Sequence, residues 1–210
     1  MAGVKIGRMV IGGYGTNCYL IYREGSQDVI FVDPADHGDQ IYRKMSEKGF
    51  RIQAILLTHA HFDHMWGAND LRKLTGAKIY ALEEERVLCE SAQANVSDMA
   101  GRACTIRPNV YVKDGDQLTL ADVTFQVIAT PGHTAGSCCY YFEEGGFAVC
   151  GDTIFLESVG RTDFPTGDSS RLIRSIKEKL FTLPDEVKLY PGHGDSTTVG
   201  HEKKYNPFCQ

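Results

Sequence analysis

The sequence predicts an α/β protein with mixed β-sheets, and three observations lead to this class. Short apolar runs typical of strands alternate with amphipathic stretches in both halves of the chain. Some strand-like runs follow one another with only turn residues between them, which indicates hairpins. A chain of 210 residues with 42% hydrophobic and 23% charged side chains can bury a sizeable core, and we expect one domain over residues 1–210.

The N-terminal half opens with three predicted strands, which Gly-rich or polar turns separate. A helix follows them, because Ile41 and Met45 lie four residues apart and Gly49 provides a C-terminal stop. A buried strand, a helix closed by Gly76 and a short strand complete this half. In chain order these elements are strands Val4–Ile11, Cys18–Tyr22 and Val29–Val32, helix 39–48, strand Ile52–Leu57, helix Met65–Leu74 and strand Lys78–Tyr80.

The C-terminal half begins with residues 90–107, which have no clear hydrophobic period. We expect a long surface loop there, and its length and irregularity raise the hypothesis of a lid over a binding site. Strands follow, and one amphipathic helix has Leu172, Ile173, Ile176 and Leu180 on a single face. The predicted elements are strands Val123–Ala129, Cys138–Phe142 and Phe147–Cys150, helix 168–180, and strand Val187–Tyr190 before a short tail.

Charge and composition argue against several classes of protein. The net charge of −5 disfavours a nucleic-acid backbone or an anionic membrane surface as partner. No apolar run approaches the roughly 18 residues of a membrane span, and the first twenty residues lack the apolar stretch of a signal peptide. The seven cysteines are odd in number and have no C-x-x-C spacing, which predicts reduced thiols in a cytoplasmic protein.

Histidines gather in three short places, and these carry the main functional signal. The densest is His59-Ala60-His61-Phe62-Asp63-His64, and the others are Thr130-Pro131-Gly132-His133 and Pro191-Gly192-His193-Gly194, with Gly151-Asp152 between them. An apolar strand-like run precedes each of these four segments. If those strands lie side by side, their terminal loops converge on one rim of the sheet, where a rigid scaffold can hold polar groups in place.

Histidine and carboxylate ligands suit zinc, manganese or iron. Seven such groups exceed the needs of one tetrahedral ion and suit two ions that share a bridging carboxylate and a hydroxide. Taken singly, Asp63 could be only a helix N-cap, and His133 and His193 could be turn histidines. Because four strand ends carry such residues at once, the sequence predicts a dinuclear metal site for hydrolysis of an acyl or phosphoryl bond.

The set His59, His61, Asp63, His64, His133, Asp152 and His193, in this order, resembles the metallo-β-lactamase-fold superfamily. The resemblance implies an αββα sandwich of two mixed sheets with helices outside. It implies a first metal on His59, His61 and His133, a second on Asp63, His64 and His193, and Asp152 as the bridge. Asp63 and Asp152 would then act in catalysis, and the two divalent ions would be zinc in the first instance, with iron or manganese as alternatives.

Within the superfamily, the segments 17–20, 130–137 and 151–153 are similar to glyoxalase II relatives. Segments 160–165 and 191–194 look like a short, single-domain bacterial branch of that group. The resemblance implies hydrolysis of a small-molecule thioester, such as S-lactoylglutathione, by a metal-bridging hydroxide. In full-length glyoxalase II, a C-terminal helical domain supplies basic contacts to glutathione. We expect that domain to be absent here. Arg161, Arg102 and Arg107 are therefore candidate substrate contacts. Arg161 could instead pair with Asp163 and brace the loop beside the site.

Three alternative functions remain open. A persulfide dioxygenase shares the fold and would hold a single iron with His59, His133 and Asp152. Other hydrolases of the fold, such as lactonases or β-lactamases, are a further alternative, because one sequence does not identify their substrate-contacting loops. A non-catalytic interaction module usually lacks some ligands, whereas all seven are present here. The sequence leaves the metal, the acyl and thiol parts of the substrate and the oligomeric state open.

Overall fold

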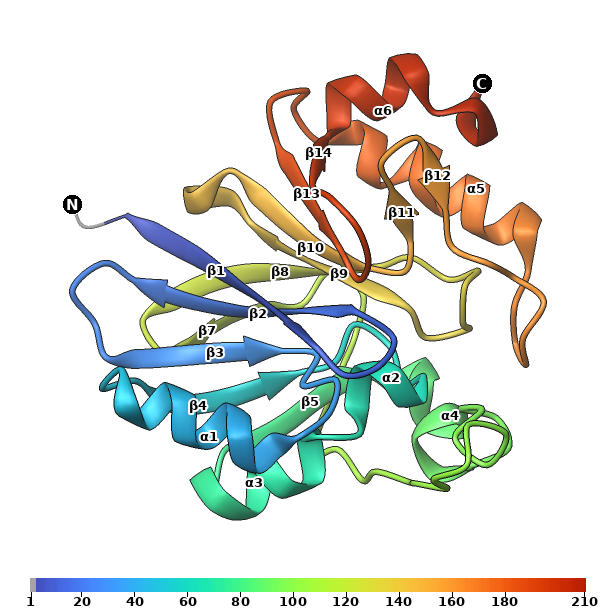
Figure 1. The fold of residues 1–210 in the computed structure, drawn as a ribbon. Helices are drawn as coiled ribbons and strands as arrows, with labels where there is room; N and C mark the ends of the chain where they lie inside the picture. The colour runs from blue at the N-terminus through green and yellow to red at the C-terminus, as the bar shows by residue number, and fades with distance from the viewer. Residues whose placement is uncertain (1–2) are drawn as a thin grey trace.

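Two six-stranded β-sheets pack face to face in the computed structural model, which describes residues 3–210 (Figure 1). The strand order is β1-β2-β3-β4-β5-β6 in the first sheet and β14-β13-β10-β9-β8-β7 in the second, and β11 and β12 form a separate pair. Apolar side chains of both inner faces, among them Tyr19, Ile30, Phe125 and Tyr140, form one buried cluster. Burial of these faces holds the two sheets together.

Both sheets are mixed, as the sequence predicts. In the first sheet β1 to β3 are antiparallel, and β3 to β6 are parallel. In the second sheet β7 to β10 are antiparallel, β13 is parallel to β10, and β14 returns antiparallel to β13. The strands are β1 (Val4–Ile11), β2 (Thr16–Arg23), β3 (Asp28–Val32), β4 (Arg51–Leu56), β5 (Lys78–Leu82), β6 (Val110–Val112), β7 (Gln117–Leu120), β8 (Val123–Ala129), β9 (Cys138–Phe142), β10 (Phe147–Gly151), β11 (Ile154–Phe155), β12 (Ser158–Val159), β13 (Lys188–Pro191) and β14 (Thr197–Thr198).

Helices cover the two outer faces, which completes the αββα arrangement (Figure 1). Ile41 and Leu71 of the first helical layer pack on the first sheet, and Leu172 and Ile176 pack on the second. The helices are α1 (Gly38–Glu47), α2 (Phe62–Met65), α3 (Ala68–Thr75), α4 (Arg86–Glu90), α5 (Ser169–Glu178) and α6 (Val199–Tyr205). Their apolar stripes face the sheets, as amphipathic helices require.

Two expectations for the helices need correction. The segment predicted as one helix over Met65–Leu74 is divided between α2 and α3, because the backbone of Gly67 packs on the loop that follows β3. A Cβ at Gly67 would lie 2.9 Å from the carbonyl oxygens of Pro34 and Asp36, and the Gly67 N–H donates to that of Pro34. The expected short tail instead contains α6, which Thr198 caps by accepting a hydrogen bond from the His201 N–H.

The remaining expectations concern a loop, the thiols and the membrane. Of the predicted loop 90–107, Glu90 is the last residue of α4, and residues 91–107 contain no strand or helix. Asn95 and Ser97 inside this loop are buried and tie the segment together. All seven cysteines are free thiols, as predicted. Within residues 3–210, no helix combines the length and apolar character needed to cross a bilayer.

Candidate metal centre

All seven side chains predicted from the histidine-rich segments meet at one edge of the sandwich. Four of them, His59, His61, Asp63 and His64, follow β4 of the first sheet. The other three follow strands of the second sheet: His133 after β8, Asp152 after β10 and His193 after β13. The strand before His59 thus lies in a different sheet from the other three strands, whereas the prediction supposed that all four lie side by side. The loops still converge, because the two packed sheets carry them at the same edge of the sandwich.

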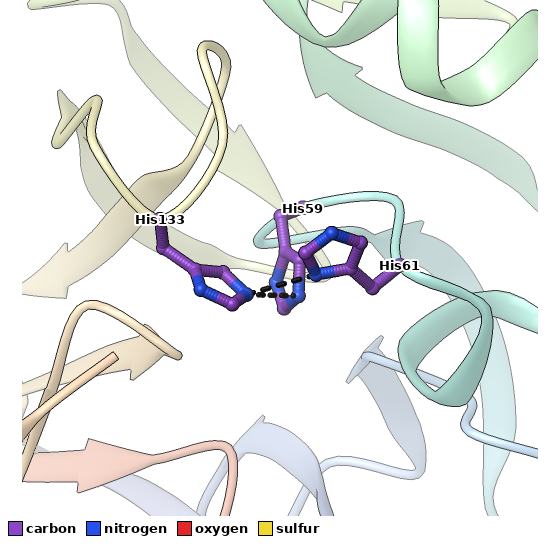
Figure 2. Close-up of side chains that lie close together, drawn as sticks. All are labelled: His59, His61 and His133. Carbon is purple, nitrogen blue, oxygen red and sulfur yellow. Dashed lines mark hydrogen bonds between the residues drawn. The ribbon is translucent and has the colours of Figure 1, made fainter. Parts of the chain in front are cut away.

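Three buried histidines form the first group, which Figure 2 shows. The Nε2 atom of His133 lies 3.2 Å from Nε2 of His59 and 2.9 Å from Nδ1 of His61. Two donors bound to one zinc ion at about 2.0 to 2.1 Å, at the tetrahedral angle, would be about 3.3 Å apart. The spacing of these nitrogens is close to that value, so the group fits a single divalent ion.

Asp63, His64 and His193 form the second group. Oδ2 of Asp63 is 3.2 Å from Nε2 of His193 and 3.8 Å from Nε2 of His64. Asp63 lies in the first turn of α2, whose N-cap residue is His61, so Asp63 is not the helix cap. Its carboxylate instead accepts a hydrogen bond from the Thr16 hydroxyl and lies beside the imidazole of His193.

Asp152 lies between the two groups. Its Oδ2 atom is 3.8 Å from Nε2 of His133 in the first group and 3.7 Å from Nε2 of His193 in the second. Its Oδ1 atom is 3.3 Å from Nε2 of His64. This position is the one that a bridging carboxylate between two ions would occupy.

Three buried atoms of this cluster have no hydrogen-bond partner, and two of them test whether it fits a metal. These two are Nε2 of His64 and Oδ1 of Asp152, which lie 3.3 Å apart, and the third is Nε2 of His61. A buried polar atom without a partner is costly, and a divalent cation between a nitrogen and a carboxylate oxygen removes that cost. Nitrogen and carboxylate ligands without thiolate suit zinc, iron or manganese. The residues therefore fit a divalent metal centre.

Burial keeps the histidines of the first group in the form that binds metal. It lowers the pKa of His61 to about 3, with a further contribution from the neighbouring His133. Burial also lowers the pKa of His59 well below its usual value, and that of His133 as well. All three imidazoles are therefore neutral near pH 7, and neutral imidazole is the metal-binding form.

In the second group, the pKa of the buried histidine His64 is raised instead of lowered. Burial lowers the pKa of His64, but the carboxylates of Asp152, Asp63 and Asp33 outweigh it and hold that pKa well above its usual value. Burial raises the pKa of Asp152, and the nearby imidazoles, His64 first, bring it below its usual range. The carboxylates of this corner therefore favour a positive charge, which a metal ion bound at His64 would supply in place of the proton.

Asp33, which the sequence analysis did not single out, fixes the orientation of His64. Its Oδ2 atom lies 2.9 Å from Nδ1 of His64 and accepts a 2.6 Å hydrogen bond from the Thr58 hydroxyl. Its Oδ1 atom accepts from the Thr58 backbone N–H at 2.8 Å. A carboxylate behind a histidine selects the tautomer that presents the other nitrogen. The signal was available, because Asp33 directly follows the predicted strand Val29–Val32.

Glu85 was also missed, and it connects the loops of the two sheets. This residue is fully buried. Its Oε1 atom accepts a 2.7 Å hydrogen bond from the Ala60 N–H, between His59 and His61. Its Oε2 atom accepts from the Thr134 hydroxyl at 2.8 Å and the Gly136 N–H at 2.9 Å, in the loop of His133. Glu85 thus holds the two loops of the first histidine group together.

The turn that carries His193 is held by strand β2 of the opposite sheet. Side chains of Asn17 and Tyr19 donate to the Pro191 carbonyl at 3.0 and 2.7 Å, and Asn17 also donates to the Gly194 carbonyl. Gly192 lies against the metal-binding side chains, since a Cβ there would be 2.2 Å from Oδ1 of Asp152. Only glycine leaves room for Asp152 at this position.

A cavity of about 480 Å³ opens above the cluster. Its lining includes Arg161, but the guanidinium is engaged with Asp163 through two hydrogen bonds of 2.7 Å and stacks on Phe164 at 3.8 Å. The Arg161 backbone carbonyl accepts from Nδ1 of His133 at 2.7 Å. These contacts support a role of Arg161 as a brace for the loop and the His133 ring, and its place in the cavity lining leaves the substrate contact as a prediction.

The other candidate contacts lie elsewhere. The Arg102 guanidinium pairs with Asp36 at 2.7 Å and stacks on Trp66 at 4.0 Å. Neither Arg102 nor Arg107 is among the residues that line the cavity, and the same holds for residues 90–107 as a whole. The lid hypothesis for that segment therefore gains no support from the lining.

Sequence comparison identifies the family. The profile of the metallo-beta-lactamase superfamily matches residues 11–193, which include all seven clustered side chains. The chain belongs to this superfamily. A probable metallo-hydrolase of Bacillus subtilis, YqgX, is 36% identical over 207 residues, which cover 98% of this chain and 97% of the relative. The hydroxyacylglutathione hydrolase GloC of Haemophilus influenzae is 32% identical over 201 residues, with 94% of each chain covered.

Solved structures of the metallo-β-lactamase superfamily share the architecture. The BLEG-1 B3 metallo-beta-lactamase matches with a TM-score of 0.93 at 33% identity, over 98% of this chain and 99% of that one. TTHA1623, solved in a di-iron-bound form, matches with a TM-score of 0.86 at 33% identity, over 96% and 99% of the two chains. The expected fold is confirmed. The chain is a metallo-hydrolase of this fold, and its His and Asp groups are suited to divalent metal.

Proposed function

We propose that this metallo-hydrolase is a thioesterase of glyoxalase II type that holds two divalent ions, with zinc as the first choice. Its substrate would be a small hydroxyacyl thioester such as S-lactoylglutathione. Water adds to the thioester carbonyl carbon, the C–S bond breaks, and the products are a hydroxy acid and a thiol. The observation that carries the proposal is the presence of two separate three-residue ligand groups with Asp152 between them, and of a further group, His59, His64 and Asp152, that connects the two. The similarity to GloC supports the choice of a thioester.

Each residue of the cluster would have a defined role. His59, His61 and His133 would hold the first ion, Asp63, His64 and His193 the second, and Asp152 would contact both. When bound, two such ions supply a Lewis acid and a water that ionises near neutral pH. Asp33 keeps Nε2 of His64 directed at the cluster, because the other ring nitrogen, Nδ1, bonds to its carboxylate. A thiolate is a good leaving group, so no dedicated general acid is required.

The ligand count argues against the mononuclear alternative. A dioxygenase with one iron would use His59, His133 and Asp152 and leave the second group without a purpose. In this structure the ligand atoms of Asp63, His64 and His193 all lie within 4.8 Å of one another, which supports a second ion.

The seven free thiols support a reducing compartment, and we include the cytoplasm in the proposal.

Elemental analysis together with thiol release from S-lactoylglutathione tests the function. We expect close to two zinc ions per chain, and a loss of turnover of at least a hundredfold in Asp152→Asn and His59→Ala. His201→Gln is the matched control, because His201 pairs with Glu157 away from the cluster. Two bound metals without hydrolysis of any acyl thioester would refute the thioesterase. One iron per chain, with oxygen uptake on glutathione persulfide, would favour the dioxygenase instead.

A further inference from the structure

Aromatic side chains surround the metal-binding cluster on several sides. Phe164 packs edge-on against His61 of the first group, with ring centroids 5.5 Å apart. Phe155 packs against His193 of the second group at 6.3 Å. Phe62 and Tyr14, with centroids 4.8 Å apart, complete the set on the side of α2. All four rings line the cavity, and we call them the aromatic collar.

The cavity wall offers little to a charged group. Arg161 is the only lysine or arginine among the lining residues, and its guanidinium is already bonded to Asp163 and stacked on Phe164. Asp163 already neutralises its charge, so a substrate carboxylate would compete with Asp163 for it. The remaining ionisable residues of the lining are Tyr14, which is one of the four rings, and members of the His and Asp cluster itself. Apart from that cluster, the wall recognises its ligand mainly by apolar contact.

The collar lies on both sides of the cluster, and this determines which part of a substrate meets it. A thioester carbonyl must be placed at the two ligand groups for hydrolysis, and its two substituents diverge from the trigonal carbonyl carbon. One direction leads past Phe164 beside the first group, and the other past Phe155 beside the second. The acyl substituent therefore meets an aromatic ring in either orientation of the thioester.

We propose that the aromatic collar makes the enzyme prefer thioesters whose acyl group carries an aromatic ring or a branched apolar chain over the lactoyl thioester. This inference rests on the proposed thioesterase function. The methyl group of a lactoyl substituent fills little of a cavity of about 480 Å³. Transfer of a phenyl ring from water to such a wall is expected to raise kcat/KM by about ten- to a hundredfold.

The test compares S-lactoylglutathione with S-mandeloylglutathione, in which phenyl replaces methyl and the thiol is unchanged. Each rate is divided by the alkaline hydrolysis rate of the same compound, which removes the difference in intrinsic reactivity. We expect kcat/KM for the mandeloyl compound to be at least tenfold higher. Phe164→Ala or Phe155→Ala should reduce that ratio at least threefold, whereas Phe208→Ala, an exposed phenylalanine outside the cavity, should not. A ratio near one in the wild type, or a ratio unchanged in both collar variants, would overturn the inference.

Binding of the product acids separates this inference from the proposed function. Calorimetry on the metal-loaded protein should show mandelate binding at least tenfold more tightly than lactate, and the difference should shrink in a collar variant. If no thioester is hydrolysed but mandelate still binds preferentially, the thioesterase is wrong and the apolar collar stands. If thioesters are hydrolysed but mandelate and lactate bind equally, the thioesterase stands and the collar inference is wrong.

Discussion

Glu85→Gln tests the carboxyl group that joins the two loops of the first histidine group. The substitution keeps the shape of the side chain and removes its titration. In the folded protein, burial raises the pKa of Glu85 from 4.5 to about 7, although Ala60, Thr134 and Gly136 all donate hydrogen bonds to it. Burial therefore outweighs the three donors, and the ionised carboxylate is the costly form.

The sign of the pH effect follows from this shift. A folded-state pKa above the unfolded value means that the folded protein binds the proton more tightly than the unfolded chain. The stabilisation is complete below pH 4.5 and is lost as the pH rises through about 7. A difference of about 2.5 pKa units corresponds to about 3 kcal/mol, of which roughly 2 to 3 kcal/mol falls between pH 5 and pH 8.

The assay is chemical denaturation of wild type and Glu85→Gln at pH 5 and pH 8, with the free zinc concentration held constant. We expect the difference in the free energy of unfolding to shift by about 2 to 3 kcal/mol in favour of the variant at pH 8. Other groups titrate in both proteins and cancel in the comparison. Glu84→Gln, at the exposed neighbouring position, should show no such shift. A wild-type-to-variant difference that is the same at both pH values would refute the reasoning.

Three further predictions concern the metal centre. Gly192→Ala should bind fewer than two metals per chain by elemental analysis, because its Cβ would lie 2.2 Å from Oδ1 of Asp152. The control Gly13→Ala has open space at its Cβ and should bind the full number. Asp33→Asn should weaken zinc affinity about 10- to 100-fold in competition with a chromophoric chelator, since it disturbs the bond to His64. Removal of metal by a chelator should lower Tm, and added zinc should restore it; an unchanged Tm would count against the centre.

The sequence predicts most of the fold where hydrophobic patterns are strong. Strands β1, β8 and β9 begin and end at the predicted residues, because each is a continuous or alternating apolar run. Weaker patterns were missed. Strand β7 (Gln117–Leu120) is short and alternates with polar residues at the edge of its sheet, and α6 contains a charged run, Glu202 to Lys204. Sheet pairing and tertiary contacts, rather than local pattern, define these elements.

The residues of the candidate centre itself were easier to predict from the sequence than the residues that hold them in place. The clustered histidines and aspartates stand out because several lie close together in the chain and each group follows a strand. Asp33 could have been found by the same rule, since it directly follows β3. Glu85 could not, because it lies in the run Glu83-Glu84-Glu85, and only the folded structure shows that the third of these is buried between two loops.

Both groups of the centre are divided between the sheets in the same way. His59 and His61 come from the first sheet and His133 from the second, and Asp63 and His64 from the first sheet are completed by His193 from the second. Neither sheet alone provides a full group, so a metal ion contacts a complete set only when the two sheets are packed together. Metal binding should therefore stabilise the sheet packing, and the partnerless buried atoms of His64 and Asp152 identify where that stabilisation is gained.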